Sequence, residues 1–72
     1  MSRIVALGED DRLAGFALAG AAVIEATTDA EIRRAWDELD ADVGFVIMSA
    51  RASRTLGSVL GNRADVLTAV LP

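Results

Sequence analysis

Four short apolar segments alternate with three helical ones along this 72-residue chain, and that alternation is the strongest constraint on its fold. The apolar segments cover residues 4–7, 21–26, 43–48 and 66–71. Short apolar runs that contain β-branched residues are typical of strands buried in a parallel sheet. Because parallel strands need long crossover connections, we expect the segments between them to form helices that pack on the sheet.

The three helical segments show an apolar repeat together with residues that begin or end helices. The first covers about 11–19, and Gly20 follows where a helix would stop. Ahead of the second, Thr28 and Glu31 have the spacing of a capping box, in which each side chain binds the other residue's backbone amide. The third covers about 50–60. The sequence therefore predicts a β-α-β-α-β-α-β order.

This order predicts one α/β domain that covers residues 1–72. Right-handed crossovers place helices on both faces of a sheet, which gives three layers. We expect a four-stranded parallel sheet of order 2-1-3-4 with three helices, a flavodoxin-like or Rossmann-like half. Phe16 and Trp36 fall at the helical spacing of core residues, so we interpret them as packing against the sheet.

The residue inventory excludes several classes of function. The chain has no cysteine and no histidine, which excludes thiolate chemistry, serine–histidine triads and ordinary zinc sites. Its net charge of −4 argues against nucleic-acid binding. No segment assembles a nucleophile, a base and an oxyanion site, so we expect a protein that is not an enzyme and holds no cofactor or metal. No apolar run suits a signal peptide or a membrane span, which predicts a cytoplasmic location.

The acidic run Glu9-Asp10-Asp11 follows the first strand, where open parallel sheets commonly bind ligands. A dinucleotide fingerprint is not met, because only Gly8 and Gly15 occur there and the carboxylates would repel phosphates. A phospho-receiver needs a carboxylate after the third strand, but that strand ends in Ser49, and the chain contains no lysine. The favoured interpretation is a solvated helix N-terminus with Asp10 as its N-cap.

The run GEDDRLAGFALAG over residues 8–20 resembles the amino-terminal signature of the F subunit of V-type and A-type ATPases, roughly GDxDTVxGFxLAG. Residues 42–52 resemble that family's third strand and the start of its third helix, and residues 68–72 resemble its fourth strand with the following proline. Arg12 stands where the family has threonine. The resemblance marks these residues as the family signature and as possible partner contacts: Gly8, Asp10, Asp11, Gly15, Phe16, Leu18 and Gly20.

The resemblance implies a non-catalytic part of a central stalk, which turns with the rotor and couples ATP hydrolysis or synthesis to ion transport. It also implies a protein partner, the coiled-coil D subunit of the stalk, and a position peripheral to the membrane through the ATPase complex. The family's carboxy-terminal helix would begin after Pro72, so the chain resembles a truncated member. A second hypothesis is a stand-alone oligomeric interaction domain that kept the fold but lost the stalk role, and a degenerate phospho-receiver is a distant third.

The last apolar segment, residues 66–71, is expected at an edge of the sheet and carries no charge that would discourage pairing with another chain. Small residues of the third helix, Ala50, Ser53 and Gly57, offer another surface for close packing. We therefore expect the isolated chain to form a homodimer or a larger oligomer.

Overall fold

A computed structural model describes residues 3–9 and 11–72, and its elements follow the predicted order. With η denoting a 3-10 helix, they are β1 (Arg3–Gly8), η1 (Asp11–Ala19), β2 (Ala22–Glu25), α1 (Asp29–Asp37), β3 (Val43–Met48), α2 (Ala50–Leu56), η2 (Gly57–Asn62) and β4 (Leu67–Val70). The strands form one sheet of order β2-β1-β3-β4, and every neighbouring pair is parallel. The predicted α/β class and strand order are confirmed.

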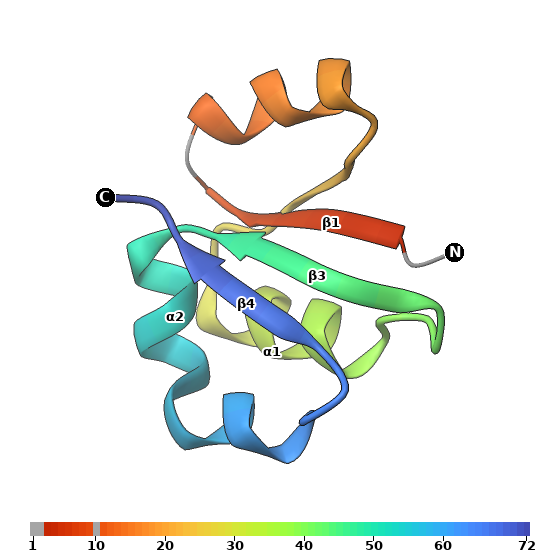
Figure 1. Cartoon of the computed structure of the whole chain (residues 1–72). Coiled ribbons are helices and arrows are strands. Elements are labelled where there is room, and N and C mark those ends of the chain that lie inside the picture. Colours follow the sequence, from red (N-terminus) through yellow and green to blue (C-terminus); the bar gives the residue numbers. More distant parts are fainter. Residues whose placement is uncertain (1–2, 10) are drawn as a thin grey trace.

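The helices cover the two faces of the sheet unequally (Figure 1). On one face α1 and α2 pack against each other and against β1. On the other face η1 packs on β1 and β2. The arrangement has the three expected layers, but one outer layer consists of a single short helix.

The hydrophobic core lies between the sheet and the α1–α2 pair. Its strand residues include Val5, Leu7, Val46 and Met48, and its helix residues include Ile32, Trp36, Ala52 and Leu56. Trp36 is buried, as its helical spacing predicts. Burial of apolar surface at about 25 cal/mol per Å² makes this half of the domain the main source of its stability.

The first helical segment has the expected bounds but is a 3-10 helix. Its apolar spacing predicts that Leu13, Phe16, Ala17 and Gly20 share one face of a helix, and the structure separates them. Leu13 is buried and Phe16 half-buried, whereas Ala17 and Gly20 are exposed. A 3-10 helix has three residues per turn, so it aligns Leu13 with Phe16 and turns Ala17 away from that row.

The third helical segment is interrupted, contrary to the prediction of one helix over 50–60. The α-helix ends at Leu56 because Gly57 adopts φ +50°, a conformation that an α-helix cannot continue. The helical spacing of this segment predicts Ala52, Leu56, Val59 and Leu60 on its inner face. The chain goes on as η2, and this change of direction leaves Val59 38% exposed. Ala52 and Leu56 are buried as expected.

The capping box at the start of α1 is confirmed. The Glu31 amide donates to the Thr28 hydroxyl at 3.1 Å, and Glu31 Oε1 accepts from the Thr28 amide at 3.1 Å and the Thr27 amide at 2.9 Å. Hydrogen bonds from Thr27, first from its amide, lower the pKa of Glu31. The stabilisation from ionised Glu31 is therefore complete at neutral pH and is lost as the pH falls through this lowered pKa.

We expect Thr28→Ala to lower the free energy of unfolding by about 1 kcal/mol, because the first turn of α1 loses its side-chain acceptor. The matched control is Thr28→Ser, which keeps the hydroxyl and should stay close to the parent. Chemical denaturation followed by circular dichroism measures both. Equal losses for the two variants would contradict a capping role.

Candidate functional site

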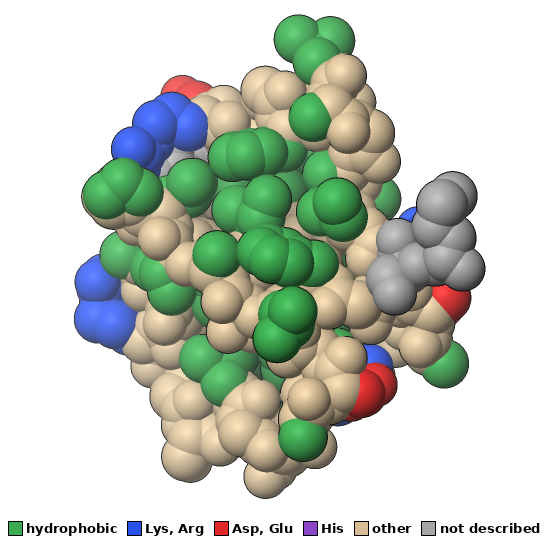
Figure 2. Space-filling model, in the orientation of Figure 1, with side chains coloured by type: hydrophobic (Ala, Val, Ile, Leu, Met, Phe, Trp, Pro, Cys, Tyr) green, Lys and Arg blue, Asp and Glu red, His purple; other side chains and the backbone are tan. Residues whose placement is uncertain are grey.

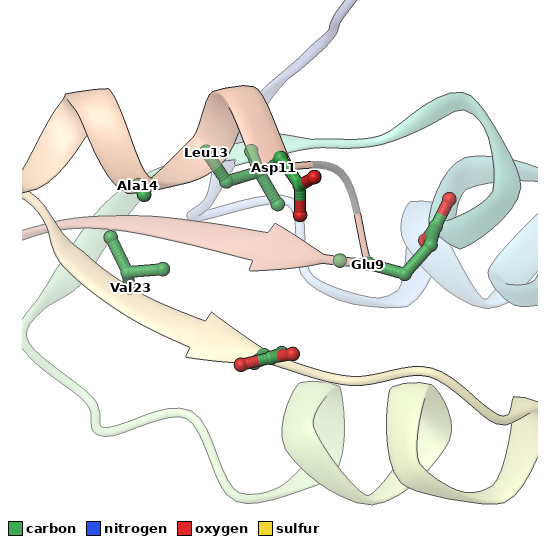
Figure 3. A pocket seen from close by; sticks show the side chains of 7 residues that line it. Glu9, Asp11, Leu13, Ala14 and Val23 are labelled. Carbon is green, nitrogen blue, oxygen red and sulfur yellow. The ribbon is translucent and has the colours of Figure 1, made fainter.

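A cleft of about 310 Å³ opens at the carboxyl ends of β1 and β2, the place where open parallel sheets commonly bind ligands (Figure 3). It is lined by Gly8, Glu9, Asp11, Leu13, Ala14, Val23 and Glu25. Three of these residues carry carboxylates. The Glu9 side chain extends away from Asp11 in Figure 3, so the two carboxylates do not converge on one point.

Ser49 lies beside this cleft and joins three elements. Its amide donates to the Leu7 carbonyl at 3.2 Å, which ties the end of β3 to β1. Its hydroxyl donates to Glu9 Oε2 at 2.8 Å and accepts from the Ala52 amide at 3.1 Å, as the N-cap of α2. A receiver would carry its acceptor carboxylate at this position. Here the side chain is a buried serine with its hydroxyl already in use.

Gly8 is required by the close approach of Ser49. A Cβ atom on Gly8 would lie 2.5 Å from Ser49 Oγ and 2.8 Å from Ser49 Cβ. Gly8 also has φ +148°, which side chains rarely tolerate. The first glycine of the signature run thus has a structural role, since it makes room for the residue that caps α2.

Gly15 differs from Gly8, because no atom beyond its chain neighbours and the adjacent backbone of its own helix lies within 4 Å of the Cβ position on Gly15. Packing against the sheet therefore does not explain this glycine. Leu18 on the same helix is 94% exposed, although it is a large apolar side chain. Together they leave an uncovered apolar surface on η1.

The remaining signature residues lie around the same helix. Asp11 is exposed at the first position of η1, and Phe16 is half-buried. Gly20 has φ +94°, with its amide bonded to the Ala17 carbonyl at 3.1 Å, so the predicted left-handed stop is confirmed. Asp10, expected as the N-cap, lies outside the described residues.

Three further hydrogen bonds connect the helices to neighbouring parts of the chain. The Arg12 guanidinium donates to the Pro72 carbonyl oxygen at 3.0 Å, which links the start of η1 to the end of the chain. On the other face, Asp29 of α1 accepts from the Thr55 hydroxyl at 3.0 Å and from Arg51 at 3.3 Å. These two donors, Thr55 first, lower the pKa of Asp29.

We expect the acidic loop to bind no divalent cation with sub-millimolar affinity. Glu9 is held by Ser49, and among the described residues no group of three or more acidic side chains is placed to hold a metal ion. Calorimetric titration with Mg²⁺ and Ca²⁺ measures the affinity, with Glu25→Gln as a variant that removes one of the two other lining carboxylates. Sub-millimolar binding that is lost in this variant would show the expectation to be wrong.

We expect Gly8→Ala to destabilise the fold by about 2 kcal/mol or more, because the new methyl group overlaps Ser49. The matched control is Gly15→Ala, where no atom lies nearby. Alanine is the better helix former, so this change should be neutral or stabilising by up to about 1 kcal/mol. Thermal unfolding measures the stability of both variants. A larger loss of stability for Gly15→Ala than for Gly8→Ala would contradict the structural role of Gly8.

The fold and these positions define an α/β domain whose described signature residues lie at the end of β1, on η1 and directly after η1. The sequence model of the ATP synthase (F/14-kDa) subunit family matches residues 4–72, so the chain belongs to that family. The resemblance to the F subunit of V-type and A-type ATPases is thereby confirmed. The family consists of non-catalytic ATPase subunits.

No curated protein matches the chain significantly. Within the part of the chain that the structure describes, no helix has the length and apolar character needed to cross a bilayer.

Proposed function

We propose that the protein is a non-catalytic central-stalk subunit of a V-type or A-type ATPase, where it turns with the rotor and couples ATP hydrolysis or synthesis to ion transport. The observation that carries this proposal is the match of the subunit family over residues 4–72, nearly the whole domain. The proposed location is cytoplasmic, peripheral to the membrane through the complex.

The proposed partner surface is the outer side of η1. Leu18 exposes almost its entire side chain there, and Gly15 leaves the helix backbone uncovered. An exposed large apolar residue beside a bare backbone suits close packing of another helix, because burial removes apolar area from water and the missing side chain permits close approach. The resemblance names the partner as the coiled-coil D subunit of the stalk.

The test is co-purification of the tagged chain with the coiled-coil stalk protein encoded in the same genome. Leu18→Glu should reduce capture of the stalk protein by about tenfold or more, because it places a charge in the proposed contact. The matched control, Val59→Glu, changes a partly exposed apolar residue on η2 and should leave capture unchanged. Capture that is absent, or equal for both variants, would overturn the proposed surface.

The second candidate function is a stand-alone interaction domain that associates with itself. The observation that favours it is the edge strand β4, all four of whose residues are exposed.

A further inference from the structure

The sheet face that carries η1 stays largely open over β3 and β4. On β3, Val46 and Met48 point into the α1–α2 core, so the alternate residues Phe45 and Ile47 point to the opposite face. Leu67 and Ala69 of β4 pair in register with Phe45 and Ile47, which places them on that same face. Figure 2 shows hydrophobic side chains gathered over these strands, with charged ones at the margins.

This open face continues to the free edge of β4. Leu67 is 67% exposed, and the four residues of the strand, Leu67–Val70, include no charged side chain. A charge, a proline or a covering segment usually protects an edge strand from pairing with another chain. Within β4 the protein has none of these devices.

The register shows which backbone groups the edge presents. The Leu71 amide donates to the Met48 carbonyl at 2.9 Å, and in a parallel ladder only alternate residues bond to a given neighbour. Ala69 therefore directs its amide and carbonyl toward β3. Thr68 and Val70 direct theirs outward, away from the sheet.

We propose that β4 is the interface between two copies of this chain, which pair their β4 strands antiparallel about a twofold axis and join their sheets into one. Because this axis is perpendicular to the joined sheet, the open apolar faces of the two copies lie on the same side of it. With Ala69 at the axis, the outward groups of Thr68 bond to those of Val70 in the second copy. Leu67 then lies opposite Leu71 of the second copy, and this pair extends the open apolar face across the interface.

Charge complementarity at the ends of β4 favours a second copy as the occupant. Asp65 precedes β4 with its side chain 67% exposed and its Oδ1 3.8 Å from Arg63 Nε. Antiparallel pairing carries Asp65 to the carboxyl end of the other copy's strand. That end holds Pro72, whose carbonyl oxygen lies 3.0 Å from the Arg12 guanidinium. Asp65 of one copy therefore lies near Arg12 of the other, and the twofold axis repeats this pair of opposite charges at the other end of the interface.

The decisive variant is Thr68→Pro, which removes an outward amide and leaves the amides that bond to β3 intact. Its matched control is Thr68→Val, which keeps the amide and the size of the side chain. In sedimentation at high micromolar concentration the parent and the control should have twice the 7.5 kDa mass of one chain. The proline variant should associate at least about tenfold more weakly than the parent, and its circular dichroism spectrum should be unchanged.

A measurement on the unaltered protein guards against misfolding of a variant. In hydrogen exchange followed by NMR, the amides of Thr68 and Val70 should become protected as the protein concentration rises. A 7.5 kDa species at every concentration, with these amides exchanging rapidly, would overturn the proposal. So would equal weakening by the proline and valine variants.

A charge exchange tests the second copy as the occupant. Asp65→Arg alone should weaken association, and adding Arg12→Asp should restore it, because the pair of charges is then reversed. If the double variant does not restore association, this register is wrong. The proposal goes beyond the stalk role and is distinguishable from it, since Leu18→Glu should leave the dimer unchanged.

Discussion

The contact between Gly8 and Ser49 is the point on which the rest of the domain depends. It brings the end of β1 against the residue that links β3 to α2, and the buried hydroxyl of that residue both caps α2 and binds Glu9. The Ser49 amide completes the junction through the Leu7 carbonyl. A side chain at position 8 would separate these strands at the carboxyl edge, where the cleft and the start of η1 are positioned.

Local signals in the sequence predicted most of the fold, because each element carries its own. The capping box of Thr28 and Glu31 and the alternation of strands with helices are local patterns, and both were confirmed. The 3-10 form of η1 and the break at Gly57 were not predicted, since small energy differences between helix types depend on packing. The hydrogen bond from Ser49 to Glu9 joins residues 40 positions apart, and no local pattern reports such a contact.

The sequence predicts that β4 is an edge strand, but not which of its backbone amides are free. Its place at the edge follows from the strand order, which the alternation of elements predicts. Nothing in the uncharged sequence of residues 66–71 distinguishes Ala69 from Thr68 as the position at which a proline would disrupt edge pairing alone. The register shows that the Ala69 amide faces β3, so a proline there would damage the sheet itself. The hydrogen bonds between a strand and its neighbour determine which of its backbone amides point out of the sheet edge.

The unequal covering of the sheet connects the two surfaces of the molecule. The α1–α2 pair buries one face, and η1 packs on β1 and β2 of the other, so β3 and β4 keep an apolar face of their own. A domain of this size buries only roughly 60% of the surface of its unfolded chain, and added contacts contribute much to its stability.

The strand order separates η1 from the β4 edge, because β3 lies between β1 and β4. A stalk protein at Leu18 of η1 and a second copy on β4 would therefore occupy different sides of the domain. Arg12 lies between them, since it starts in η1 and bonds to Pro72 beyond β4. Where the family has threonine, this chain thus has a cation that ties its signature helix to its edge strand, a contact that threonine is too short to make.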